Sequence, residues 1–230
     1  MRIAWRQGTA ARLVCCPGMM GRISSSARHA TDDQLEAYRA RRKSGKSPEP
    51  EGQRRASRNP PIFVVQEHQA STHHFDFRIE VDGVLKSWAV PRGPSTDPRD
   101  KRLAVAVEDH PLDYAEFEGA IPKDEYGGGA VIVSDRGSYD NLTVKNGKLK
   151  PVADAIADGH LIIALHGQKL SGGYALQRIG GGEQTKWLLI KTRDDDADAR
   201  RRPTSTQPRS VLSGRTVRQV AKAAAHEDHG

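Results

Sequence analysis

The chain has 230 residues and a net charge of +7, and only 36% of its residues are hydrophobic and 5% aromatic. This length suits one domain with its own core, and the low apolar content predicts a folded core with polar, disordered ends. No apolar run approaches the roughly 20 residues of a membrane span. The two cysteines, Cys15 and Cys16, are adjacent and cannot join distant segments. We therefore exclude integral membrane proteins and disulfide scaffolds, and we expect a cytoplasmic protein.

The N-terminal part of the chain is predicted to be a disordered leader over residues 1–30, because it is basic with one short apolar stretch. Residues 31–43 are predicted to form a short helix with Thr31 as its N-cap. Residues 39–58 carry eight basic and two acidic residues, whereas residues 59–191 are net acidic. Such a basic segment is typical of proteins that neutralise nucleic-acid phosphates, and it also fits a solvated arm.

Short runs rich in valine, isoleucine and leucine begin at Ile62, and Gly, Pro, Asn and Asp separate them. Most of these runs alternate with a period of two residues. This pattern predicts a mainly β fold, an antiparallel barrel or sandwich, with one or two short helices. We place the folded domain at residues 31–198 and expect a disordered tail at 199–230, where Arg, Asp, Pro, Ser and Thr dominate.

The densest chemical signal is the sequence QEHQASTHHFDFRIE. In a strand, residues two apart share a face, so His74, Asp76 and Arg78 point one way and the phenylalanines between them face the core. A tight turn through QAST would return His68 beside His74. Two imidazoles and one carboxylate suit Zn, Mn or Fe, and a neighbouring arginine can grip a phosphate oxygen. The alternative is a solvent-facing polar strand with a chance histidine pair, and His73 receives no role.

Other segments add candidate polar groups. Glu108 and His110 share a predicted strand face, and Tyr114 follows a proline-induced turn. His110 is suited to binding phosphate or acting as a general acid. Arg92 lies in a Pro/Gly turn, where its guanidinium and the backbone can face an anion. The glycine-rich sequence PKDEYGGG lacks the lysine and spacing of a P-loop, which argues against a P-loop nucleotide site.

Several of these segments, FVVQEHQASTHHFDFRIEV, VEDHPLDY, GYALQRI and TKWLLIKT, closely resemble the 3′-phosphoesterase domain of bacterial DNA ligase D. The resemblance covers about residues 34–198, and its motif H-x5-H-x-D-x-R is long and specific. It implies a small β-barrel enzyme that removes 3′-terminal ribonucleosides and 3′-phosphates from DNA in repair by end joining. It also implies a divalent metal, typically manganese, with zinc or cobalt as alternatives.

The resemblance further implies roles for individual residues. By motif position, His68, His74 and Asp76 match metal ligands, and Arg78 and His110 match residues that contact the scissile phosphate. The other positions that match the family's active site are Gln66, Arg92, Arg102, Glu108, Tyr114 and Glu49. The expected partners are DNA or an RNA-tipped primer-template, and separate ligase or polymerase proteins of end joining. We expect no membrane partner and a monomer.

The chain departs from the family pattern at two places. Arg92 stands where many relatives have lysine. The pair Arg42-Lys43 replaces an Arg-Asp pair that contributes to ribonuclease activity, so we expect 3′-phosphatase activity to exceed 3′-ribonuclease activity. We expect a stand-alone form or a fragment, since no ligase or polymerase domain follows. Two other functions stay open: a weakly catalytic nucleic-acid-binding module, and a metal β-barrel that acts on a small acid.

Overall fold

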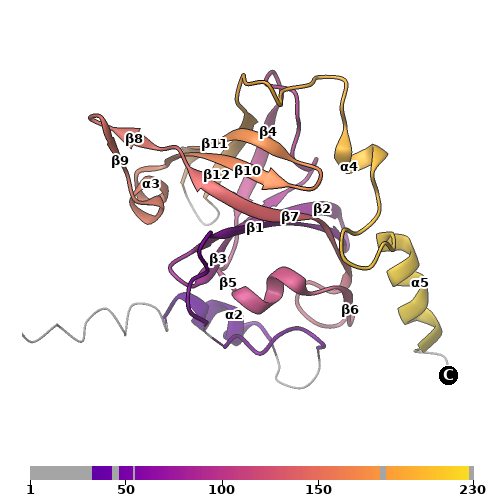
Figure 1. Ribbon diagram of the computed structural model, residues 1–230. Coiled ribbons are helices and arrows are strands. Elements are labelled where there is room, and N and C mark those ends of the chain that lie inside the picture. The colour runs from indigo at the N-terminus through magenta and orange to yellow at the C-terminus, as the bar shows by residue number, and fades with distance from the viewer. Residues whose placement is uncertain (1–32, 43–46, 54, 182–184, 228–230) are drawn as a thin grey trace, which may run out of the picture.

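The structure of the protein is a computed structural model that describes residues 33–42, 47–53, 55–181 and 185–227 (Figure 1). The predicted leader, the proposed N-cap, Lys43 and both cysteines lie outside the described residues.

The elements follow one another along the chain in the order that the sequence pattern predicts, with short strands separated by turns. The strands are β1 (Ile62–Gln69), β2 (His73–Val81), β3 (Val84–Val90), β4 (Lys101–Ala106), β5 (His110–Pro111), β6 (Gly119–Ile121), β7 (Gly129–Asn141), β8 (Val144–Lys145), β9 (Lys148–Leu149), β10 (His160–Gly167), β11 (Ser171–Gly180) and β12 (Lys186–Lys191). The helices are η1 (Asp33–Leu35), α2 (Glu36–Ala40), η2 (Leu112–Glu116), α3 (Val152–Asp158), α4 (Pro203–Thr206) and α5 (Val217–Glu227).

The main sheet closes on itself as an antiparallel barrel. Its strands run in the order β1-β2-β3-β4-β12-β11-β10-β7, and β7 pairs in turn with β1. β6 extends the sheet beyond β7, β5 pairs with β3, and β8 and β9 form a separate hairpin. Closure leaves no unpaired strand edge around the ring, which stabilises a sheet made of short strands. The predicted compact antiparallel β-barrel with short helices is confirmed.

Apolar side chains pack on both faces of the wall formed by β1, β2, β3 and β7. On the inner face, Phe75, Phe77 and Ile79 join the core of the barrel, as the alternation in β2 predicts. On the outer face, a second cluster that includes Val64 and Leu85 packs under η2 and α2. Figure 1 shows these two helices below β1 and β3. The outer face of this wall is therefore a covered surface, and the polar side chains of β2 lie on it.

The prediction of a disordered tail at 199–230 is wrong for the residues that the structure describes. Val217 and Val220 of α5 are buried against β7, and the Lys169 ammonium donates a hydrogen bond to the carbonyl oxygen of Gln207 at 2.8 Å. The two valines are three residues apart, so they share one face of the helix, and β7 covers that apolar face. No helix within the described ranges is both long and apolar enough to cross a membrane.

Candidate active site

The β1–β2 hairpin forms the floor of the site. Its register places His68 opposite His74 and Gln66 opposite Asp76, so the turn through QAST returns the chain as predicted. These side chains lie on the outer face of the barrel wall, whereas the phenylalanines of β2 lie in the core. Because side chains alternate along a strand, β2 has one polar face although it is buried on both sides.

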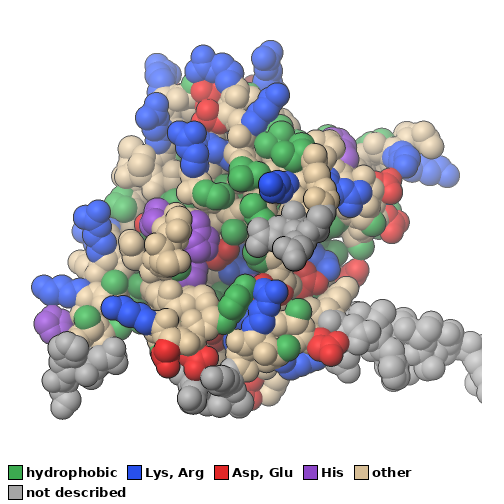
Figure 2. Space-filling model, turned by 180° about the vertical axis from the view of Figure 1, so that it is seen from behind, with side chains coloured by type: hydrophobic (Ala, Val, Ile, Leu, Met, Phe, Trp, Pro, Cys, Tyr) green, Lys and Arg blue, Asp and Glu red, His purple; other side chains and the backbone are tan. Residues whose placement is uncertain are grey.

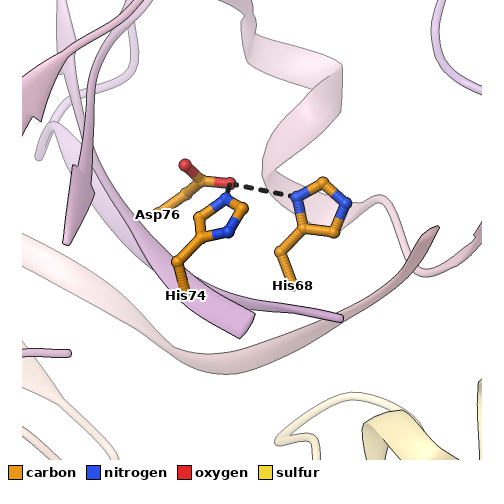
Figure 3. Close-up of side chains that lie close together, drawn as sticks. All are labelled: His68, His74 and Asp76. Atoms are coloured by element: carbon orange, nitrogen blue, oxygen red, sulfur yellow. Dashed lines mark ion pairs between the residues drawn. The ribbon is translucent and has the colours of Figure 1, made fainter. Parts of the chain in front are cut away.

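His68, His74 and Asp76 come together as a possible metal cluster (Figure 3). An Asp76 carboxylate oxygen lies 3.9 Å from His68 Nδ1 and 3.8 Å from His74 Nε2, and the three ligand atoms all lie within 4.8 Å of one another. Two donors about 2.1 Å from one ion can be at most about 4.2 Å apart. Both pairs with Asp76 satisfy that limit, and the two imidazole nitrogens lie no more than 4.8 Å apart.

The protonation of the two histidines also suits a metal. His74 Nδ1 lies 2.9 Å from the carbonyl oxygen of Thr72 and donates to it, which leaves the Nε2 lone pair facing Asp76. Burial lowers the pKa of His68, which favours the neutral imidazole that binds metals. The three side chains therefore fit a divalent ion held by two imidazoles and a carboxylate, with further coordination positions open.

Arg78 lies next to this cluster and is fixed from three sides. Its guanidinium contacts an Asp76 oxygen at 3.0 Å and donates to Gln66 Oε1 at 2.9 Å and to Ser87 Oγ at 2.8 Å. Gln66 is fully buried and donates in turn to the carbonyl oxygen of Tyr114. Gln66 and Ser87 thus position the arginine, and Arg78 is the group placed to meet an anion beside the candidate metal cluster.

His110 forms the opposite wall. Its Nδ1 lies 2.9 Å from the carbonyl oxygen of Glu108 and donates to it, so the Nε2 lone pair faces Arg42 at 3.4 Å. Burial, together with the charges of Arg78 and Arg42, holds the pKa of His110 well below its usual value. His110 is consequently neutral at neutral pH, which suits a hydrogen-bond or proton acceptor better than the general acid that the sequence suggested.

Glu49 ties the segment before the barrel to the site. Its carboxylate accepts hydrogen bonds from the Tyr114 hydroxyl and from Arg42 Nε, both at 2.9 Å. The Arg42 guanidinium also lies over the Tyr38 ring, 3.7 Å from its centroid. Burial raises the pKa of Tyr114 well above its usual value, so the hydroxyl keeps the proton it donates. Glu49 and Tyr114 therefore hold Arg42 in place.

Sequence reasoning missed two residues at the rim of the site, Arg41 and Tyr126. Arg41 contacts Glu108 at 2.9 Å and donates to the Tyr126 hydroxyl at 2.6 Å, which joins the helical segment to the glycine-rich loop. In the sequence, only the basic character of the segment pointed towards Arg41, whereas Arg42 had been noted through the family pattern. The hollow between these groups has a volume of about 260 Å³, and its polar lining includes Arg42, His68, His74, Asp76, Arg78, Glu108, His110, Tyr114 and Tyr126.

Two of the sequence candidates lie elsewhere. Arg92, just after β3, and Arg102, in β4, do not line this hollow, and they contribute instead to a second one with the segment that follows β12. The sequence could not distinguish these two arginines from the residues that line the first hollow, because a series of short strands does not indicate which of the connecting loops lie close together in the fold.

The chain is similar in sequence to a known protein family. Residues 66–178 match the family model described as the DNA ligase D 3′-phosphoesterase domain. The central part of the chain therefore carries the match to this family. The resemblance seen in the sequence is thereby confirmed, and of the candidate residues only Glu49 lies outside the matched range.

The chain is also similar to curated multifunctional non-homologous end joining LigD proteins. It is 47% identical to that of Pseudomonas aeruginosa over 188 residues, which is 80% of this chain and 22% of the relative. It is 44% identical to that of Mycobacterium tuberculosis over 163 residues, 70% of this chain and 20% of the relative. For Mycolicibacterium smegmatis the identity is 37% over 198 residues, 85% of this chain and 25% of the relative. The chain thus spans a fifth to a quarter of these relatives.

Proposed function

We propose that the chain is a metal-dependent hydrolase that removes phosphate from the 3′ ends of DNA in repair by end joining. One observation carries the proposal: a His-His-Asp cluster, a buried arginine and a neutral histidine line the same hollow in a chain that matches the DNA ligase D 3′-phosphoesterase family model. A module that only binds DNA has no need of a metal cluster, and this favours hydrolysis over tethering.

Manganese is the metal that we propose, with zinc and cobalt as the alternatives. His68, His74 and Asp76 would hold it, and the bound ion would act as a Lewis acid on a phosphate oxygen and lower the pKa of a bound water. The protein side chains would position the substrate and stabilise the charge that develops on the phosphate.

The side chains around the cluster have separate tasks. Arg78 would bind phosphate oxygens and stabilise the charge that develops on them, because its guanidinium is already oriented by Gln66 and Ser87. Neutral His110 would accept a hydrogen bond from the substrate or the attacking water. Glu108 would orient the arginines of the helical segment.

The proposed substrate is a primer-template with a 3′-phosphate, and removal of a 3′-terminal ribonucleoside would be slower. Arg42 and Glu49 are paired in the site, but Lys43 stands where many relatives have an acid. An acid that positions a ribonucleoside is thus missing from the pair, whereas the groups needed for phosphate removal are present. Ligase and polymerase proteins of end joining would be the partners, and we propose that the chain acts as a monomer.

The test is a comparison of two matched primer-templates, one with a 3′-phosphate and one with a single 3′-ribonucleotide, each with manganese or with EDTA. We expect manganese-dependent release of phosphate, and slower removal of the ribonucleoside. DNA binding without turnover on either substrate would favour the binding module instead. Equal or faster ribonucleoside removal would contradict the selectivity, and hydrolysis in EDTA would contradict the metal.

A further inference from the structure

A second hollow, of about 340 Å³, lies between the loop that joins β3 to β4 and the segment that follows β12. Arg92 and Arg102 stand on the first side, and Arg201 and Arg202 on the second. Both segments reach the top of the molecule in Figure 1. At the same height, Figure 2 shows a group of Lys and Arg side chains on the face that also carries a group of histidine side chains.

The second wall of this hollow is fixed to the barrel. The Thr96 hydroxyl lies 2.6 Å from the carbonyl oxygen of Arg201, and the Thr96 carbonyl accepts a hydrogen bond from the Asp198 N–H at 2.9 Å. Gly93 has a φ of +66°, and a Cβ there would lie 2.8 Å from Cγ2 of Thr204. Only a glycine allows the loop and the tail to approach this closely. The arginines of the tail are therefore held against those of the loop.

The charge of the hollow is only partly neutralised. Asp97 and Asp100 also line it, and Asp100 pairs with Arg102 at 2.6 Å. Yet Arg102 Nε is buried without a hydrogen-bond partner among the described residues. Among the residues that the structure describes, neither the Arg92 nor the Arg202 guanidinium has a carboxylate oxygen within 4.0 Å. Unpaired guanidinium donors in a concave site are suited to a phosphate group, which they can bind in a planar fork.

We propose that this hollow binds a backbone phosphate of a DNA strand whose 3′ end lies in the hollow lined by His68, His74 and Asp76, here called the metal hollow. Arg202 of the tail would contact that phosphate. The inference rests on the proposed function. Ala89 of β3 lines the metal hollow, and Arg92 follows it by three residues, so their Cα atoms are at most about 11 Å apart. At about 3.4 Å per nucleotide along a strand, this separation corresponds to at most about three nucleotides, so we place the bound phosphate within about three nucleotides of the 3′ end.

The tail side of this hollow lies outside the range that matches the family model. The match ends at residue 178, whereas the second wall of the hollow comes from residues 199–205. The tail segment thus adds a strand-binding element to the hydrolytic site.

The test measures binding rather than turnover, with the full chain and a primer-template that ends in a 3′-hydroxyl. Arg202→Ala should weaken binding about tenfold, since it removes a charge-assisted hydrogen bond. It should also reduce the slope of log K against log salt by about 0.9, the value for one phosphate contact on duplex DNA. Arg200→Ala is the matched control, because Arg200 carries the same charge two residues away, is 95% exposed and does not line the hollow.

A second measurement locates the phosphate. A neutral methylphosphonate placed within about three nucleotides of the 3′ end should weaken binding of the wild type and have little further effect on Arg202→Ala. Equal binding by Arg202→Ala and Arg200→Ala, additive effects at every linkage, or no binding by the wild type would overturn the proposal. Failure of the proposed function would appear differently, as absence of phosphate release by a wild type that still binds DNA in this Arg202-dependent way.

Discussion

The two hollows differ in how the chain builds them. The metal hollow has its floor on one hairpin, where His68 and His74 are neighbours across the register, and its charged groups are buried and partnered. The second hollow, the arginine hollow, is lined by Arg92, Arg102, Arg201 and Arg202 and joins segments about 100 residues apart, as the Thr96–Asp198 contact shows with a separation of 102 residues. Among the residues that the structure describes, Arg92 and Arg202 have no carboxylate partner. Groups that take part in chemistry need fixed geometry, which buried hydrogen bonds provide, whereas a site that holds a backbone phosphate needs mainly open positive charge.

The largest expected effect is the loss of activity when a residue of the metal cluster is replaced. Asp76→Asn replaces a proposed metal ligand by a neutral group of similar size and removes the ion-pair partner of Arg78 at 3.0 Å. Even residues behind the ligands cost about 10–100-fold when changed, so we expect a loss beyond 100-fold. Phosphate release at saturating manganese measures it, with thermal unfolding as the control for folding. Turnover close to that of the wild type would remove Asp76 from the site.

The next effect concerns the arginine beside the metal ligands. Arg78→Lys keeps the charge but loses the fork that contacts Asp76, Gln66 and Ser87. We expect kcat to fall on the order of 100-fold, as for the loss of one preorganised donor. Arg136→Lys on β7 makes the same chemical change at a partly exposed site and should leave the rate unaltered. An active Arg78→Lys variant would reduce Arg78 to a structural charge.

A smaller effect tests whether the tail belongs to the fold. Val220→Ala should lower the free energy of unfolding by about 1–2 kcal/mol, because it empties part of the contact between α5 and β7. Lys222→Ala changes an exposed position of the same helix and should have almost no effect. Urea denaturation distinguishes the two. If both variants unfold like the wild type, α5 contributes nothing to the barrel.

The smallest effect is a pH dependence of stability. Because the pKa of His110 is lowered in the folded chain, the unfolded chain binds the proton more readily below about pH 6.5. Stability should therefore fall as the pH drops below that value, and it should be unaffected by this group above it. His110→Asn should make the fall shallower, whereas the exposed His166→Asn should not. Urea midpoints between pH 5 and 8 measure this, and identical slopes in all three proteins would contradict a neutral, buried His110.

Sequence periodicity predicted the parts of the molecule that depend on neighbouring residues. The alternation in 73–81 predicted both the core face and the polar face of β2, and the tight turn predicted the return of His68. The order of the strands in the barrel has no such local signature. β12 closes the ring between β4 and β11, although it lies beyond the family match.

The sequence could not reveal contacts between distant segments. Arg41 and Tyr126 meet at the rim from positions 85 residues apart, and no spacing in the chain indicates it. Likewise, the resemblance placed Arg92 and Arg102 among the active-site positions, and the fold places them in a hollow with Arg202 of the tail. Such pairings are decided by the packing of whole elements.

The central claim is that His68, His74 and Asp76 bind a divalent metal, and manganese binding by the full chain tests it most directly. The electron paramagnetic resonance signal of free manganese, followed during a titration, reports the bound fraction. We predict saturable binding that His74→Ala abolishes and that His73→Ala preserves, because His73 faces away from the cluster and pairs with Glu67 at 2.9 Å. Equal manganese binding by His74→Ala and the wild type would contradict the account.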